Sequence, residues 1–80
     1  MLAFVLKLCR RSDGLILATF PDVPGAVAWG HDDSEAFCNA AMALKRALGR
    51  YVEAGFEIPR PRAKGVLLVE VEEPATPALA

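Results

Sequence analysis

Residues 18–36, ATFPDVPGAVAWGHDDSEA, contain the order of turns and caps that decides the fold of this chain. A strand ends at Pro21, because proline lacks the N–H that a central sheet ladder needs. A Pro-Gly turn then leads into a short strand over 26–29. Asp32 precedes Glu35 by three residues, which fits a capping box that satisfies the free N–H groups at a helix start. The stretch therefore predicts a strand, a turn, a second strand and a helix.

A hairpin precedes this stretch. Residues 2–10 alternate with the period of two that is typical of a strand. One face carries Phe4, Leu6 and Leu8, and the other carries Val5, Lys7 and Cys9. Asp13-Gly14 follows, and Asp-Gly between two alternating runs is a strong hairpin signal because glycine adopts the positive φ of a tight turn. The second strand is therefore expected over 15–20, antiparallel to the first.

The longest predicted element is an amphipathic helix over about 33–54, ended by Gly55. Its apolar face consists of Phe37, Ala40, Ala41, Leu44, Leu48 and Tyr51, and its polar face of Glu35, Asn39, Arg46, Arg50 and Glu53. The small residues of the helix would allow it to lie close to a sheet. Met42 on the polar side and Gly49 inside the helix are not explained by core packing. Each is either a tolerated surface residue or the mark of a contact with another chain.

The prolines of residues 56–61 predict an extended connection, and 66–71 reads as a last strand. The order is β-β-β-α-β, an α+β fold with a mostly antiparallel sheet and one helix on one face. The last strand is expected to return parallel to a neighbour through a right-handed crossover. We expect one domain over 1–71 and a disordered Pro and Ala tail over 72–80.

A single helix covers one face of a four-stranded sheet, so the other face meets solvent or a second subunit. The alternation assigns Val5, Cys9 and Leu17 to that second face. An apolar second face predicts a homo-oligomer, a dimer or a tetramer.

Composition excludes several classes of protein. Nine basic and ten acidic residues give a net charge of −1, so whole-molecule charge offers no argument for nucleic acid. No apolar run reaches the roughly 18 residues of a membrane span, and the N-terminus lacks the pattern of a signal peptide. Two cysteines are too few for a disulfide framework or a zinc site. We expect a cytoplasmic protein without a cofactor.

Four motifs in order resemble the N-terminal domain of the HicB-like antitoxins. They cover about residues 2–71. The motifs are a strand opened by Gly14, FPD-x-PG from Phe20 to Gly25, a helix entry with Gly30, Asp32, Glu35 and Ala36, and GxxIPxP from Gly55 to Pro61. Each motif alone is ordinary turn or cap chemistry, but their shared order and spacing are specific.

The resemblance implies a partial ribonuclease-H-like fold that binds and neutralises a HicA-like toxin, a small basic ribonuclease with a catalytic histidine. Such an antitoxin covers the active site or the RNA-binding face of its toxin and has no chemistry of its own. Family members usually continue into a DNA-binding module. The sequence ends nine residues after Val71 without a counterpart of that module, which makes DNA binding a doubtful expectation for this chain.

Candidate partner-binding residues follow from exposure and charge. Exposed tryptophans are enriched at interface hot spots, and a group of carboxylates would attract a basic toxin. The candidates are Asp22, Trp29, His31, Asp32, Asp33 and Glu35. For Trp29 the alternative is a side chain that closes the end of the core.

Enzymatic and ligand-binding alternatives remain open. A two-metal nuclease needs several carboxylates converging on two ions, and none of the acidic residues falls at an inward position in mid-strand. His31 has no serine or cysteine placed for it to activate, so we predict no enzyme. Two groups of basic residues are either solvated or contact RNA phosphates. The first consists of Lys45, Arg46 and Arg50, and the second of Arg60, Arg62 and Lys64. The alternative function is a solitary HicB-like module that binds a small ligand or RNA.

Overall fold

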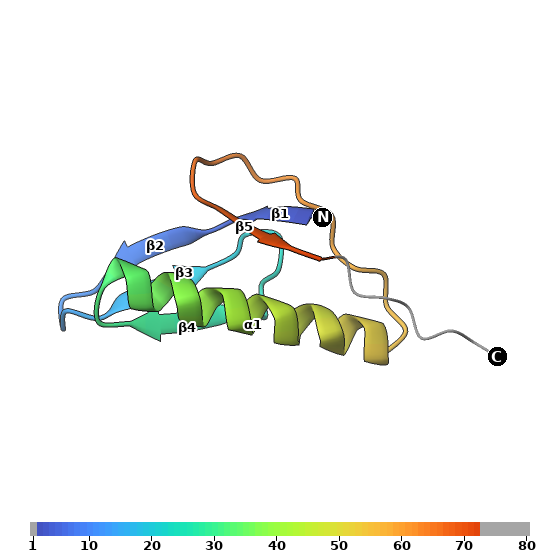
Figure 1. Cartoon of the computed structure of the whole chain (residues 1–80), viewed down its shortest axis with the longest axis horizontal. Helices are drawn as coiled ribbons and strands as arrows, with labels where there is room; N and C mark the ends of the chain where they lie inside the picture. Colours follow the sequence, from blue (N-terminus) through green and yellow to red (C-terminus); the bar gives the residue numbers. More distant parts are fainter. Residues whose placement is uncertain (1, 73–80) are drawn as a thin grey trace.

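A computed structural model describes residues 2–72 of the chain. Its elements are β1 (Leu2–Val5), β2 (Lys7–Arg10), β3 (Ile16–Thr19), β4 (Val27–Gly30), α1 (Asp33–Glu53) and β5 (Leu68–Val71). The strands form a three-stranded sheet in the order β2-β3-β4 and a two-stranded sheet that pairs β1 with β5, and every pairing is antiparallel (Figure 1). This architecture confirms the predicted α+β class with a single long helix. The tail predicted over 72–80 lies, from residue 73 on, outside the described residues.

The hairpin between β2 and β3 forms where the Asp-Gly signal predicts it. Gly14 has a φ of +87°, and the Arg11 N–H donates to the Leu15 carbonyl at 2.8 Å. The Asp13 carboxylate accepts the Leu15 N–H at 3.0 Å, which fixes the turn from its own side chain. Within the strands, Cys9 lies opposite Leu17.

The predicted first strand is divided at Leu6 between the two sheets. The Leu6 N–H donates to the Leu67 carbonyl at 2.9 Å, which links the end of β1 to the residue before β5. The predicted alternation is kept through this break, because Phe4 and Leu6 are buried in the main core and Leu8 packs against it. A single four-stranded sheet was therefore the wrong expectation, although the assignment of side chains to faces was right.

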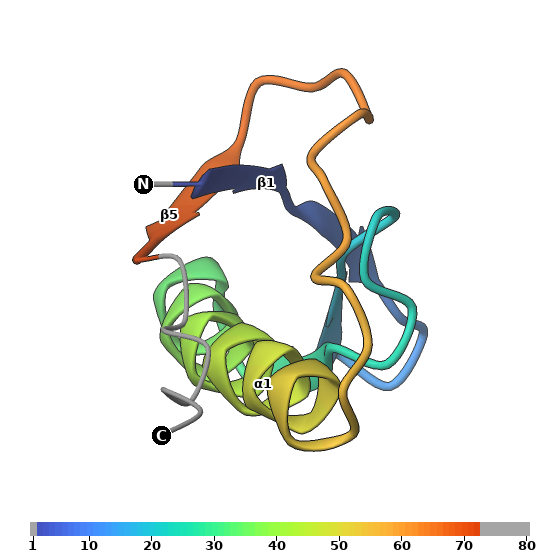
Figure 2. The same cartoon turned by 90° about the vertical axis from the view of Figure 1, so that its right-hand side faces the viewer.

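The last strand is antiparallel to its neighbour, which corrects the predicted parallel crossover. Leu2 pairs with Val71 and Phe4 pairs with Val69. The reason is the connection over residues 54–67, which runs back along the length of the molecule after α1 ends, as Figure 1 shows. The chain therefore reverses direction three times between β4 and β5: from β4 into α1, from α1 into the connection, and from the connection into β5. In Figure 2 the connection arches from the end of α1 to the start of β5.

The connection also covers part of the second sheet face. Val5 is only 4% exposed, and a Cβ atom on Gly65 would come within 2.7 Å of its Cγ1 atom, so the chain at Gly65 lies against Val5. The expectation that Val5 lies on an open second face was therefore wrong. Leu68, which pairs with Val5 on the same face, is nevertheless 46% exposed, so the connection covers this face only in part.

One carboxylate fastens this connection to the rest of the domain. The backbone N–H groups of Ala63 and Arg62 both donate to Oδ2 of Asp22, each at 2.9 Å. These two hydrogen bonds hold the pKa of Asp22 below its ordinary value of 3.8, because they stabilise the ionised form. Asp22 lies in the turn between β3 and β4, so it joins segments that are about 40 residues apart.

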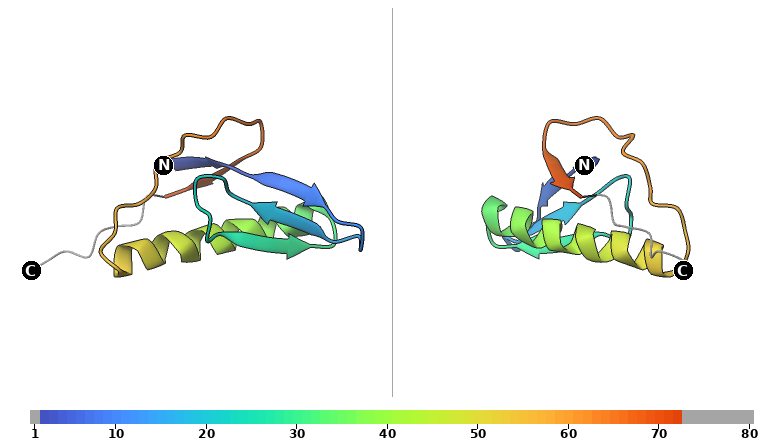
Figure 3. Two further views of the ribbon diagram at one scale, coloured as in Figure 1. Left: turned by 180° about the vertical axis from the view of Figure 1, so that it is seen from behind. Right: turned by 45° about the vertical axis from the view of Figure 1, so that its right-hand side comes forward.

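The helix packs closely on β3 and β4, as Figures 1 and 3 show. Its buried residues are small or of medium size, namely Ala36, Ala40, Leu44, Ala47 and Leu48. The facing residues Ala18 and Ala28 of the sheet are also buried. At Gly30 the approach is closest, since a Cβ atom there would lie within 2.6 Å of the Ala36 Cα atom.

Both ends of α1 are capped as the sequence predicts. Oδ1 of Asp32 accepts the Glu35 N–H at 2.8 Å. At the other end Gly55 has a φ of +77°, and two backbone bonds, Gly55 N–H to the Val52 carbonyl and Phe56 N–H to the Tyr51 carbonyl, form a Schellman motif. The predicted helix end therefore agrees with the structure to within one residue.

Two glycine substitutions are expected to have opposite effects on stability. Gly30→Ala should lower the free energy of unfolding by about 2 kcal/mol or more, because the new methyl group overlaps the backbone of Ala36. Gly49→Ala should raise it by about 1 kcal/mol, because a Cβ atom meets nothing within 4 Å there and alanine is the better helix former. Urea unfolding followed by circular dichroism measures both. A Gly30→Ala variant as stable as the parent would contradict the close approach.

The two hydrogen bonds that Asp22 accepts from Arg62 and Ala63 should make the stability of the fold depend on pH. A carboxylate with a lowered pKa stabilises the folded state above its unfolded-state pKa, and this contribution is lost as the pH falls through the lower folded-state pKa. Asp22→Asn should therefore lower the melting temperature at about pH 7, and the difference from the parent should shrink toward about pH 2. Glu57→Gln, an exposed carboxylate of the same connection, is the control. A difference in melting temperature that stays constant across this pH range would refute the claim that ionised Asp22 stabilises the fold.

Candidate protein-binding site

The register of the three-stranded sheet aligns a row of side chains on the face that points away from α1. Cys9 of β2, Leu17 of β3 and Trp29 of β4 lie directly opposite one another, and opposed side chains in an antiparallel sheet share a face. Thr19 and Val27 form the adjacent pair on the same face. We define Cys9, Leu17, Val27 and Trp29 as the outer sheet patch. Leu17 is half-buried, and the other three residues are exposed.

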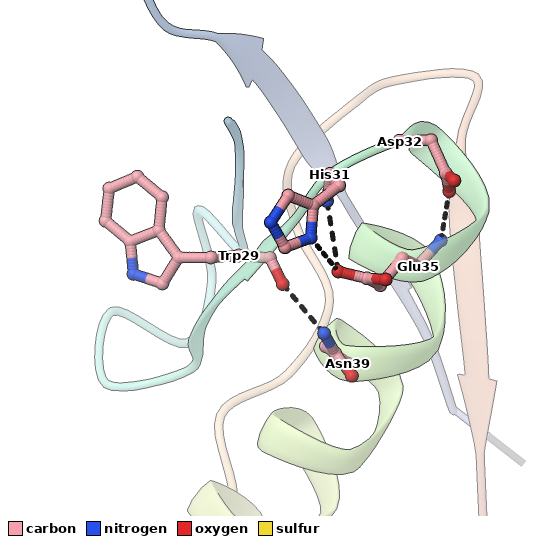
Figure 4. Close-up of polar contacts among 5 residues, drawn as sticks. All are labelled: Trp29, His31, Asp32, Glu35 and Asn39. Carbon is pink, nitrogen blue, oxygen red and sulfur yellow. Dashed lines mark hydrogen bonds and ion pairs between the residues drawn. The ribbon is translucent and has the colours of Figure 1, made fainter. Parts of the chain in front are cut away.

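Trp29 is the largest side chain of this patch, and 41% of it is exposed. Figure 4 shows its indole pointing away from α1. The guanidinium carbon of Arg11 lies 5.0 Å from the ring centroid, within the range of a cation–π contact. The Arg11 Nε atom is also 3.8 Å from Oδ2 of Asp13. The indole is therefore held in position on the surface. Its exposure does not agree with the alternative that Trp29 closes the end of the core.

The carbonyl of Trp29 is tied to the helix. Nδ2 of Asn39 donates to this oxygen at 2.7 Å, as drawn in Figure 4. Sequence analysis assigned Asn39 to the polar face of the helix and missed this bond. The bond depends on the angle between β4 and α1, and the periodicity of the helix carries no information on that angle.

The acidic residues gather at the junction between β4 and α1. Oε1 of Glu35 lies 2.8 Å from Nδ1 of His31 and accepts the His31 backbone N–H at 3.1 Å. The predicted capping box thus forms with one difference, because Glu35 reaches back to His31 rather than to Asp32. Both bonds from His31 lower the pKa of Glu35, the ring contact more than the backbone contact. Asp33 is exposed in the first turn of the helix.

A hollow of about 510 Å³ opens beside this junction. Its lining combines the acidic helix start with the end of β2 and consists of Arg10, Gly14, Ile16, His31, Asp32, Asp33 and Ser34. The carboxylates lie at the positive end of the helix dipole, where negative charge stabilises the helix. We define His31, Asp32, Asp33 and Glu35 as the acidic junction.

Five of the six predicted partner-binding residues are brought together by the structure. Trp29 and the acidic junction are adjacent along β4 and the helix start. Asp22 lies at the opposite end of β4, where its carboxylate is engaged by Arg62 and Ala63. The geometry gives Asp22 a structural contact with the connection.

Arg11, Leu17 and Val27 belong to this surface but were not among the predicted partner-binding residues. Leu17 was assigned to the second sheet face, and the length of the hairpin would have aligned it with Cys9. The contact of Arg11 with Trp29 joins the hairpin turn to β4, and no local motif indicates it.

Two further observations concern chemistry and membranes. Within residues 2–72, no three His, Cys, Asp or Glu side chains are grouped so that they could hold a metal ion. Across the same residues, α1 is not apolar enough to cross a bilayer. Both cysteines, Cys9 and Cys38, are free and exposed.

No protein-family model matches this chain. It is similar in sequence to Antitoxin HicB 2 of Photorhabdus laumondii subsp. laumondii, with 44% identity over 52 residues. The match covers 65% of this chain and 37% of the relative, so the aligned part spans little more than a third of that protein.

The fold is similar to the crystal structure of the N-terminal domain of Burkholderia pseudomallei antitoxin HicB. The TM-score is 0.75 at 20% sequence identity, and the superposition covers 89% of this chain and 99% of that domain. This chain is therefore similar in sequence to part of one HicB antitoxin and similar in fold to the N-terminal domain of another, which supports a HicB-like N-terminal domain.

Proposed function

We propose that this domain is an antitoxin that binds and neutralises a small basic toxin ribonuclease of the HicA type. Its two relatives are named as HicB antitoxins. The observation that carries the proposal is the placement of an exposed, oriented tryptophan next to a group of carboxylates. An exposed tryptophan next to charged residues is typical of a protein-binding hot spot. The negative charge of the acidic junction complements a basic partner.

The two parts of the site have different roles in this proposal. Trp29 and the rest of the outer sheet patch bury apolar surface against the toxin and slow its dissociation. The acidic junction accelerates capture of a positively charged toxin and makes the association rate sensitive to salt. The sheet and helix hold both parts rigidly, so little ordering is needed on binding.

Neutralisation then follows from steric and electrostatic occlusion. A basic ribonuclease binds RNA through the same cationic surface that carboxylates attract. A domain that occupies this surface competes directly with RNA. The carboxylates of the junction substitute for the phosphates of the substrate, and no catalytic step by the antitoxin is required.

The deciding experiment is co-expression of this chain with the small reading frame adjacent to its gene. We expect that frame to stop growth when induced alone, and we expect this chain to co-purify with its product and restore growth. A neighbour that is neither toxic nor bound would refute the proposal. RNA and small-ligand screens would then test the alternative of a solitary module.

Loss of the tryptophan anchor should weaken toxin binding strongly. Trp29→Ser should raise the dissociation constant by about 30-fold or more, because hot-spot truncations cost about 2 kcal/mol or more. Val66→Ser is a matched control, since Val66 is also an exposed apolar residue but lies outside the outer sheet patch. Isothermal titration calorimetry measures both variants. Equal losses in both variants would exclude Trp29 as the anchor.

Charge reversal at Asp33 should act mainly on the rate of association. Asp33 is the suitable position because Asp32 caps the helix and Glu35 holds His31, so that substitutions there would disturb the fold. Asp33→Lys should slow association and flatten its dependence on salt. Glu70→Lys on β5 is the control. Surface plasmon resonance at several salt concentrations gives the rates, and an unchanged salt dependence for Asp33→Lys would remove the acidic junction from the interface.

A further inference from the structure

The solvent face of α1 carries a seam along its middle that is uncharged except for Lys45, where a surface helix normally presents mostly charged residues. Successive members are four or three residues apart, which is the repeat with which one helix packs along another. The seam consists of Cys38, Met42, Lys45, Gly49, Val52 and Phe56, the last just beyond the helix end. Met42 is 53% exposed and Phe56 is 68% exposed. None of the seam residues of α1 is among its buried residues.

Phe56 has an unusual environment for its position. The residue at this place in a Schellman motif commonly packs back on the last helical turn. Here the backbone bonds of the motif are formed, yet most of the aromatic ring is exposed. The motif therefore fixes the backbone of Phe56 at the end of the seam while leaving its ring available.

Gly49 is the centre of the seam, and the domain itself gives no reason for a glycine there. A Cβ atom at this position would meet nothing within 4 Å, and alanine is the better residue inside a helix. A glycine on a helix surface lets a second helix approach more closely, because interaxial distance depends on the side chains at the contact.

We propose that α1 packs antiparallel against α1 of a second copy of this chain, with the two-fold axis passing beside Gly49. Such an axis brings each residue before Gly49 opposite the residue equally far after it in the other copy. Lys45 lies four residues before Gly49, and Glu53 lies four residues after it. Met42 and Phe56 lie seven residues before and after. Lys45 therefore meets a carboxylate of the other copy, and Met42 meets an aromatic ring, a favourable sulfur contact.

The charges favour this arrangement over a parallel one. In a parallel pair in register, Lys45 would face Lys45 of the other copy, and Glu53 would face Glu53 of the other copy. Both contacts bring like charges together and repel. In the antiparallel pair Glu53 lies near Lys45 and Arg46 of the other copy, and both contacts attract. The seam is therefore complementary to itself in one orientation only.

This self-association is independent of the proposed toxin site. The seam centre lies about 21 Å along the helix axis from Glu35, from the rise per residue, and the outer sheet patch is on the far side of the sheet. One helix pair of this length buries less than the roughly 1,600 Å² of a standard interface. We therefore expect a reversible dimer whose population rises with protein concentration.

Sedimentation velocity of the 80-residue chain over a range of concentrations tests the proposal. The parent chain should move from monomer to dimer as concentration rises. Gly49→Leu should weaken the dimer by about tenfold or more, while its circular dichroism spectrum stays that of the parent, because a Cβ atom at this position meets nothing within 4 Å and leucine is a good helix former. A parent chain that remains monomeric throughout, or a dimer that persists unchanged in Gly49→Leu, overturns the proposal.

A charge-swap experiment tests the orientation. Lys45→Glu and Glu53→Lys should each weaken self-association, because each places like charges opposite one another. An equal mixture of the two variants should form heterodimers, since both cross-pairs then attract. Trp29→Ser is the control and should dimerise as the parent does. Failure of the mixture to associate, or a dimer lost in Trp29→Ser and kept in the helix variants, would place the contact elsewhere and overturn the proposal.

Discussion

The close approach of β4 and α1 is the constraint on which the rest of the structure depends. Gly30 and Ala36 leave no room between them for another methyl group, and alanines continue the contact on both sides. This packing fixes the helix against the sheet within two residues of the end of β4. It thereby sets where His31 and the first helical turn emerge. It also directs the side chain of Trp29 to the opposite face, because neighbouring residues in a strand alternate.

Those parts of the fold that depend on local chemistry could be predicted from the sequence. The Asp-Gly turn, the Asp32 cap and the Gly55 helix end are determined by residues within a few positions of each other. The direction of β5 could not be predicted, since it depends on how far the connection travels before it pairs. Prolines showed that this segment is extended, but not that Asp22 would hold it against the body of the domain.

The candidate site divides in the same way. The acidic junction was predictable because its members are consecutive or nearly so and share the helix start. The outer sheet patch required the strand register, which aligns Leu17 with Trp29 from different strands. Arg11 and Asn39 required tertiary geometry as well. Asp32, Asp33 and Glu35 are equivalent candidates in the sequence, and only the contacts distinguish Asp33 from Asp32 and Glu35, whose side chains hold the local structure.

Pairing of β1 with β5 has a consequence for how the domain forms. Leu2 and Val71 are partners across almost the whole described chain, and closing so long a loop is an entropically costly and slow step in folding. The three-stranded sheet and the start of α1 need only contacts between near neighbours in sequence. The elements that carry Trp29 and the acidic junction are therefore joined by contacts of short sequence separation, which can form before β1 and β5 pair.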